Sequence, residues 1–523
     1  MSVLSRRRSV GLLAAAAIVW TPTTVASAHA HPAGRWSTPA LGTAALDSST
    51  AAVKIPDNVR FYQRRVSLLG THTWYQQRYQ HHVVIGGWYA VHDWNNRRAT
   101  IWDHRLKVRK LAKTSPAVSP ATAAANVDVR DKQAAAPRTT PGLLVLPGRA
   151  GAPARLVWRV LTTSGSGVTA SYVDAADGHT LRTVQLAKSA RPDGSRSHAR
   201  GTTTSLPQGQ VFDPNPVVSQ QDEGLTDDND ANRAVPAAAY QTVDLRNLRG
   251  NHTLVGKWAQ IINNNAATPT PDSGTGSDTY FFKRSSDYFE QVNAYYAANA
   301  EQEYLRLLGL KQVNAESQQL KTDAFADDNS YYDPSVDRIS LGSGGVDDAE
   351  DPEVIWHEYG HAIQDDQIPG FGTTQQSGAI GEGFGDYMAA VMSQAAATPN
   401  DTPITPAACL MDWDSTSYTP APHCIRRTDL NLDFRTNRNG EVHHDGQIWS
   451  RALWDMYLSP DINTTPGDDV ATRIIVEAQF NFTPSISMLA AAKRIINTAK
   501  ELPGTTPALV AAVKTAFEDR HIL

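Results

Sequence analysis

Apolar runs separated by polar, turn-forming segments recur along the first third of the chain. Short runs rich in β-branched and aromatic residues recur there between turn-forming segments, and such runs predict β-strands. The clearest runs are Val59–Gln63, Thr73–Tyr79, Val83–Val91, Leu156–Leu161, Ala170–Asp174 and Thr180–Val184. An Asp177-Gly178 pair separates the last two runs and predicts a tight hairpin. The first third is therefore expected to be rich in strands.

The apolar spacing later becomes helical. From Asp287 to Gly309 apolar residues recur every three or four positions, which predicts a long helix. Asp287 and Glu290 fit a capping box at its start, and Gly309 fits its end. The same spacing runs from about Asp468 to the end of the chain and predicts an all-helical part. Together the two patterns predict an α+β protein.

The N-terminus has the three parts of an export signal. Arg6–Arg8 is basic, Val10–Trp20 is apolar but too short to span a membrane comfortably, and Ala26–Ala28 fits a cleavage site. The paired arginines leave the general and the twin-arginine export routes open. No later stretch predicts a membrane anchor, so residues 1–30 predict a secreted, extracellular product.

Composition narrows the class of partner. The chain has 523 residues, 41% of them hydrophobic, and a net charge of −5. This length suits two or three globular domains, and the mild acidity without a basic stripe argues against nucleic acid as a partner.

Cys409 and Cys424 are the only cysteines. In an exported protein such a pair predicts a disulfide.

One short segment carries a metal-binding pattern. Asp351 and Pro352 predict the start of a helix that runs through His357, Glu358 and His361. Two histidines four residues apart lie on one helical face and can hold one metal ion between them. The glutamate beside the first histidine can reach a water on that metal. The pattern indicates a zinc hydrolase with Glu358 as base.

A second segment supplies the missing ligand. Glu382 and Asp386 lie on one face of a second predicted helix, after a connection long enough for a turn. Glu382 completes a His-His-Glu site for one zinc ion and leaves a fourth position open, while Asp386 can hydrogen-bond a ligand histidine. Gly381, Gly383 and Gly385 each cost a helix about 1 kcal/mol relative to alanine. That cost predicts close packing between the two helices.

Spacing separates this site from other zinc classes. Metzincins need glycine and histidine where this chain has Gln364 and Gln367, and aminopeptidases of the glutamate-ligand type would place their ligand near Ile380. A zinc-binding module without catalysis would not need Glu358, because a structural site usually fills its fourth position. A hydrolase of non-peptide amides remains an alternative to a peptidase.

The first 200 residues contain no catalytic constellation and end in a polar, exposed linker near residues 187–208. Residues 31–200 are therefore interpreted as a propeptide with two strand-rich subdomains, 55–110 and 140–187. Residues 201–375 are expected to form a catalytic lobe that includes the zinc helix. Residues 376–523 are expected to form a mainly helical lobe.

Just upstream of the zinc helix, an Asp- and Asn-rich stretch contains Asn329 and Tyr331. It can form an edge strand on which an extended peptide substrate pairs, with these two residues as substrate contacts. A simple hairpin turn is the alternative, and the sequence favours neither.

These motifs resemble the fungalysin family of zinc metallopeptidases, relatives of thermolysin. The resemblance rests on His357–His361, on Gly381–Asp386, and on Val442-His443 at the start of a third predicted helix. Val211–Pro216 is similar to the start of that family's mature region. The N-terminal third is similar to its propeptide, a thermolysin/fungalysin-type segment followed by a PepSY-like one.

The resemblance implies a thermolysin-like fold and a secreted endopeptidase that hydrolyses proteins or peptides and is inhibited by its own propeptide. It implies zinc bound by His357, His361 and Glu382, with Glu358 as general base and acid. It leaves calcium open as a further ion.

The resemblance also implies that His443 donates a hydrogen bond to the oxyanion, with the adjacent His444 as a competitor for that role. Thermolysin has a second, tyrosine donor before its glutamate ligand. The corresponding region here, Gly372–Thr374, has no tyrosine, which leaves that donor unassigned.

Overall fold

The computed structural model describes residues 53–127, 137–140, 142–148, 152–164, 167–186, 206–250, 252–262, 279–397, 408–464 and 469–523. The predicted export signal and nearly all of the predicted linker lie outside these ranges. The described residues all belong to one unit of the chain, residues 48–523.

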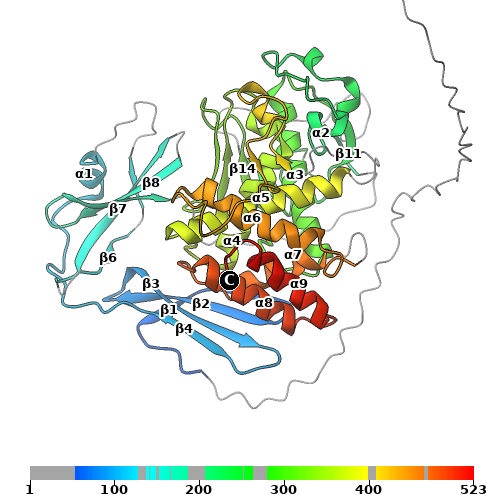
Figure 1. Cartoon of the computed structure of the whole chain (residues 1–523). Helices are drawn as coiled ribbons and strands as arrows, with labels where there is room; N and C mark the ends of the chain where they lie inside the picture. The colour runs from blue at the N-terminus through cyan, green and yellow to red at the C-terminus, as the bar shows by residue number, and fades with distance from the viewer. Residues whose placement is uncertain are drawn as a thin grey trace, which may run out of the picture. The chain divides into compact units, whose positions relative to one another are not determined.

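A single sheet runs through the N-terminal region, residues 53–186 (Figure 1). Its strand order is β1-β2-β3-β6-β7-β8-β9, with β4 paired to β3 and β5 paired to β7. The strands are β1 Val59–Val66, β2 Gly70–Tyr79, β3 His82–Trp94, β4 Thr100–His104, β5 Arg138–Thr139, β6 Leu144–Leu146, β7 Arg155–Ser164, β8 Gly167–Asp174 and β9 Thr180–Leu186.

The six predicted runs fall within β1, β2, β3, β7, β8 and β9, whereas β4, β5 and β6 were not predicted. The predicted Asp177-Gly178 turn joins β8 to β9, with Gly178 at a φ of +82°. One short helix, α1 (Pro120–Ala125), lies between the two halves of the sheet. The halves meet where β3 and β6 pair in parallel, Val83 with Leu144 and Val84 with Val145.

Two sheets follow in the next part of the chain. Strands β10 (Gln208–Val211), β11 (Gln241–Asp244) and β13 (Thr279–Tyr280) form one of them. The other has the order β12-β14-β16-β15, with β12 at Ala259–Ile261, β14 at Gln318–Lys321, β15 at Ser330–Asp333 and β16 at Arg338–Leu341. Strand β15 lies at the edge of this sheet and forms a hairpin with β16. The edge strand and the hairpin turn that the sequence left as alternatives are therefore parts of one element.

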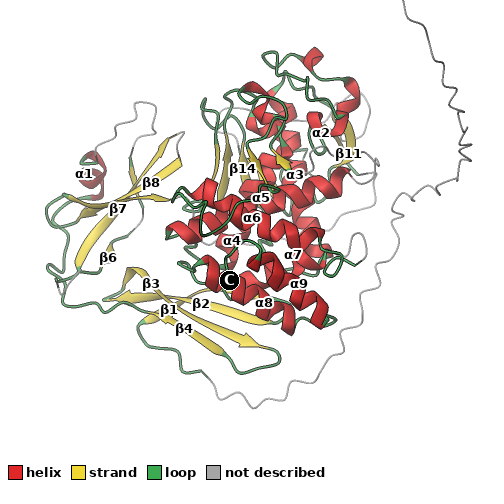
Figure 2. Ribbon diagram, in the orientation of Figure 1, coloured by secondary structure: helices red, strands yellow, loops and turns green. Residues whose placement is uncertain are grey.

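Helices make up most of the remainder (Figure 2). They are α2 Pro216–Gln220, α3 Asp287–Leu307, α4 Pro352–Gln367, α5 Gln375–Ala397, α6 Val442–Leu458, α7 Val470–Gln479, α8 Met488–Glu501 and α9 Pro507–Glu518. A short ribbon, β17 (Cys409–Leu410) with β18 (Arg426–Arg427), interrupts them. The mixed content confirms the α+β class. Among the described residues no helix is both long and apolar enough to cross a membrane.

The start of α3 differs from the prediction. Ser286, not Asp287, is the N-cap, and its hydroxyl accepts a hydrogen bond from the backbone N–H of Tyr288. Asp287 is instead the first helical residue, where its charge favours the positive end of the helix dipole. Both residue types cap helices well, so the pattern alone could not choose between them.

Polar contacts attach the N-terminal region to the helices. The guanidinium of Arg65 in β1 donates to Asp366 Oδ1 near the end of α4, from Nε at 2.7 Å and from Nη2 at 2.5 Å. The backbone N–H groups of Leu68 and Leu69 donate to the Glu477 carboxylate of α7 at 2.9 and 3.0 Å. Trp74 of β2 is fully buried in the same hydrophobic core as α4 and α7. The N-terminal region therefore shares a core with the helical part.

Candidate metal centre

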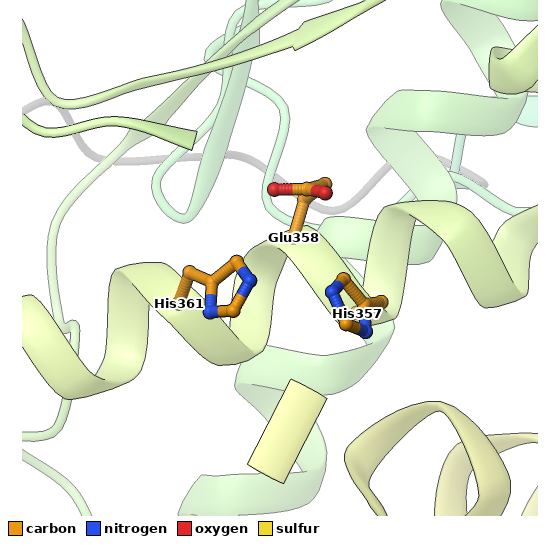
Figure 3. Close-up of side chains that lie close together, drawn as sticks. All are labelled: His357, Glu358 and His361. Carbon is orange, nitrogen blue, oxygen red and sulfur yellow. The ribbon is translucent and has the colours of Figure 1, made fainter. Parts of the chain in front are cut away.

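Helix α4 begins as its sequence predicts, with Asp351 accepting a hydrogen bond from the Glu353 N–H and Pro352 in the first helical turn. His357 and His361 follow one turn apart on this helix (Figure 3). Their ring centroids lie 4.8 Å apart, with the ring planes at 83°. Both side chains are buried. A rigid, buried helix therefore fixes both imidazoles.

Helix α5 brings Glu382 to the same point. His357 Nε2 lies 3.3 Å from Glu382 Oε2, and His361 Nε2 lies 3.6 Å from Glu382 Oε1. A tetrahedral ion with bonds of ~2.0–2.1 Å holds its ligand atoms about 3.4 Å apart. Two imidazoles and one carboxylate are also the donor set of catalytic zinc sites. The three residues therefore fit zinc and leave one coordination position for a reactant.

Glycines let these helices approach so closely. A Cβ atom on Gly385 of α5 would lie 2.7 Å from His357 Nδ1 and 2.8 Å from the His357 carbonyl oxygen of α4. A Cβ on Gly383 would lie 2.3 Å from the Gly446 carbonyl oxygen of α6. The predicted close packing of α4 on α5 is confirmed, and it extends to α6.

Gly385→Ala is expected to disturb the centre, because the new methyl group meets backbone atoms that cannot turn away. Overpacking of this kind costs about 1–3 kcal/mol, which outweighs the ~1 kcal/mol that alanine adds to helix propensity. We expect a lower melting temperature and weaker zinc retention, measured by calorimetry and metal analysis. Gly440→Ala is the control for zinc retention: a Cβ there meets nothing within 4 Å, although its φ of +89° adds local strain. Equal zinc retention in the two variants would contradict the prediction.

Asp386 contacts His357 at ring nitrogen Nδ1. Its Oδ1 lies 3.0 Å from His357 Nδ1 and accepts a hydrogen bond from Arg426 Nε at 2.7 Å. Burial alone would raise the pKa of Asp386, but the charge of Arg426 and the hydrogen bond with His357 lower it below its usual value. The ionised carboxylate fixes the His357 tautomer with its proton on Nδ1, which leaves Nε2 free to bind a metal.

Arg426 was not predicted from the sequence. It lies on β18, where Leu410 of β17 pairs with it, and the predicted Cys409–Cys424 disulfide closes the connection between these strands. The bridge is present, with the two Cα atoms 5.1 Å apart, so that prediction is confirmed. Nothing in the local sequence around Arg426 indicates that it reaches Asp386, because only the tertiary pairing brings the two together.

His443 lies in the first turn of α6, with Nε2 at 3.4 Å from Glu382 Oε2. Its Nδ1 lies 2.7 Å from Glu441 Oε1, and the Glu441 side chain also caps α6. His444 instead has its Nδ1 3.4 Å from Asp445 Oδ1. The structure thus brings His443 to the centre and pairs His444 with Asp445. Glu441 was not predicted, because a glutamate beside a helix start is typical of ordinary capping.

The Gly372–Thr374 region does not supply the missing oxyanion donor. The backbone N–H groups of Gly372 and Thr373, and the Thr373 hydroxyl, all donate to the Pro484 carbonyl. These groups tie the end of the α4–α5 connection to the loop before α8.

Tyr331 on the edge strand β15 contacts the N-terminal region. Its ring stacks on Phe325 at 5.4 Å and packs against an apolar cluster of that region. The cluster contains Val157, Leu161, Val168, Ala170 and Tyr172. Asn329 is exposed just before the strand, and its backbone carbonyl accepts from the Gly342 N–H at 3.1 Å. A contact of either residue with substrate remains a prediction.

Residues 260–460 match the family of fungalysin metallopeptidases (M36). The match runs from β12 to α6, so it includes every residue of the centre described above. The resemblance inferred from the motifs is therefore confirmed for this part of the chain. The chain has no significant match among curated proteins.

Proposed function

We propose that this zinc metallopeptidase of the fungalysin type is a secreted endopeptidase that hydrolyses peptide bonds in proteins and is made as a latent precursor. The observation that carries the proposal is the spacing of His357 Nε2, His361 Nε2 and the Glu382 carboxylate, 3.3 and 3.6 Å, on buried helices. Glu358 stands beside the first of these ligands and is itself buried.

Zinc, when bound, supplies Lewis-acid chemistry, which acidifies a water and polarises the scissile carbonyl. Glu358 takes the proton of the attacking water and passes it to the leaving amine. Its position on α4 supports this role, because the same helix fixes Glu358 and both histidine ligands.

His443 is proposed to donate from Nε2 to the oxyanion that forms on the substrate. Two distances support this role: Glu441 Oε1 lies 2.7 Å from Nδ1, and Nε2 lies 3.4 Å from Glu382 Oε2, so the ring is held with Nε2 at the centre. One such donor contributes about 3 kcal/mol to the transition state.

Contacts of the N-terminal region support latency. Its apolar cluster packs on Tyr331 of β15, the strand proposed to pair with substrate. Arg65 and the Glu477 contacts hold the same region to α4 and α7. Cutting the chain within residues 187–208 would convert this tethered region into a separate ligand that can leave.

Arg65→Ala is expected to loosen that ligand. The change removes two charge-assisted hydrogen bonds to buried Asp366, and bonds to charged groups contribute about 1.5–3 kcal/mol. After a cut within residues 187–205, we expect the N-terminal fragment to bind about 10- to 100-fold more weakly, measured from its dissociation rate. Arg60→Ala is the matched control, because Arg60, among the residues that the structure describes, bonds to backbone oxygens of its own segment. Equal dissociation rates in both variants would remove Arg65 from the interface.

The proposed function is tested on the protein secreted into the medium. N-terminal sequencing locates the cuts, and casein digestion is measured with chelator, without it, and after zinc is restored. We expect digestion that chelation abolishes and zinc restores, with a mature N-terminus near residues 187–208. Zinc-loaded protein that leaves casein intact but cleaves a small non-peptide amide would overturn the endopeptidase assignment.

A further inference from the structure

Acidic side chains crowd around the start of the zinc helix. The segment Asp347–Glu353 carries five carboxylates within seven residues. They contribute to four groups of three acidic residues in which one oxygen atom of each residue lies within 4.8 Å of the others. These groups are Asp230–Asp347–Glu350, Glu290–Asp323–Asp347, Asp328–Asp348–Asp414 and Asp351–Glu353–Asp412. A cluster of acids is not by itself a cation site, so the partners of each group decide which one needs a cation.

The Asp351–Glu353–Asp412 group is satisfied by hydrogen-bond donors. Asp351 accepts from the Glu353 and Asp414 N–H groups at 2.9 and 3.1 Å. Glu353 accepts from the Met411 N–H and Asp412 from the Asn215 amide, both at 2.5 Å. These contacts link α4 to the segment after α5 without requiring an ion.

The two groups that share Asp347 have other partners. Fully buried Arg284 pairs with Glu350 at 2.8 Å and lies 3.5 Å from Asp230, so a guanidinium already offsets that charge. Each of these groups has one buried oxygen without a hydrogen-bond partner, Asp230 Oδ1 in the first and Glu290 Oε2 in the second. In the second group, burial first, and then neighbouring Asp347 and Asp323, raise the pKa of Glu290 well above its usual value.

The Asp328–Asp348–Asp414 group differs because two of its buried oxygens lack a hydrogen-bond partner. One oxygen of Asp348 accepts from the Ser330 hydroxyl, and Asp414 Oδ2 accepts from the Tyr418 hydroxyl at 3.2 Å. The second oxygens, Asp348 Oδ1 and Asp414 Oδ1, are buried without a hydrogen-bond partner. Within the described ranges, no lysine or arginine forms an ion pair with these three residues.

The loop that contains Gly345 lies close to Asp328, the third residue of this group. A Cβ atom on Gly345 would lie 2.6 Å from Asp328 Oδ2 and 2.9 Å from the Ser417 hydroxyl, and Gly345 adopts a φ of +72°. Burial first, and then neighbouring carboxylates, raise the pKa of Asp414 well above its usual value. Two buried oxygens without partners and a close-fitting loop point to a missing positive ligand, because an uncompensated buried charge is costly.

We propose that Asp328, Asp348 and Asp414 bind a calcium ion. The donors are carboxylate oxygens only, which favours a hard cation over zinc or copper. Calcium accepts several protein carboxylates in a flexible geometry, whereas magnesium usually keeps several waters and is seldom held by protein ligands alone. A site of three side-chain carboxylates therefore suits calcium better than magnesium.

The site would join three segments around the zinc centre. Asp328 precedes the edge strand β15, Asp348 lies in the 3-10 turn that leads into α4, and Asp414 begins the turn after β17. The charge of Asp348 also interacts with that of Glu358. Bound calcium would thus hold edge strand β15 to the start of helix α4, whether or not the chain cleaves peptides.

The test uses the full zinc-loaded chain and no activity readout. Bound calcium is measured by equilibrium dialysis with metal analysis, and the melting temperature is followed against free calcium, with magnesium at equal ionic strength as reference. The wild type should bind one calcium ion at this site, and its melting temperature should rise by several degrees with calcium but little with magnesium. Terbium emission sensitised by the adjacent Tyr418 gives a second, local readout.

Two variants and a control make the outcome specific. Asp348→Asn/Asp414→Asn should lose one bound calcium ion, the melting shift and the terbium signal. Asp328→Asn, on an exposed residue, should weaken all three even if the double variant folds poorly. Asp323→Asn removes one acidic charge from a neighbouring group and should retain them. The proposal is overturned if the wild type binds no calcium, or if Asp323→Asn loses the response while Asp328→Asn keeps it.

Discussion

Glu358→Gln is expected to keep its zinc and to lose nearly all peptidase activity. Glu358 lies beside His357 on α4, but the proposed ligand set of His357, His361 and Glu382 does not include it. Glutamine has almost the same shape and can still accept a hydrogen bond from water. It cannot take the proton of that water, so a general-base contribution of about 10²–10⁴-fold is lost.

The measurement compares turnover of casein with zinc content in the same purified sample. Glu518→Gln, an exposed substitution near the end of α9, is the control and should match the wild type in both. A Glu358→Gln protein that holds one zinc ion and keeps more than a few per cent of wild-type turnover would rule out Glu358 as the base.

The sequence predicted those features that depend on interactions between residues close together in the chain. Asp351 and Pro352 start α4 as expected, because a capping side chain acts on N–H groups two or three residues away. Six of the N-terminal strands follow from runs of β-branched and aromatic residues, and the glycine content of α5 predicted its close packing on α4. At the start of α3 the predicted N-cap was wrong by one residue, because Ser286 and not Asp287 caps the helix. Both residue types cap helices well.

Contacts between distant segments could not be predicted in this way. Arg426 reaches Asp386 across 40 positions of the chain, and Arg65 reaches Asp366 across 301. Glu441 has a local capping role that conceals its contact with His443. His443 itself was expected only from the resemblance to fungalysins, since a histidine pair at a helix start has no distinctive pattern.

Glu382→Ala is expected to lose both zinc and activity, whereas Asp386→Ala should weaken zinc binding without abolishing it. Glu382 is the proposed third ligand, and two imidazoles alone would make a much weaker site. Asp386 contacts His357 and is not a proposed ligand, and loss of a residue that supports a ligand in this way typically costs 10- to 100-fold in affinity.

Because of Arg426, we expect the loss of zinc affinity in Asp386→Ala to lie toward the upper end of the 10- to 100-fold range. Removing Asp386 leaves the partly buried guanidinium of Arg426 3.3 Å from His357 Nδ1, with its closest carboxylate gone. That charge disfavours a cation at the adjacent Nε2. Zinc affinity is measured by competition with a chelator of known affinity, and circular dichroism confirms that each variant is folded. His444→Ala, whose imidazole pairs with Asp445, is the control and should keep full zinc affinity. Wild-type zinc affinity in folded Glu382→Ala would remove Glu382 from the centre, and a greater loss in Asp386→Ala than in Glu382→Ala would reverse their assigned roles.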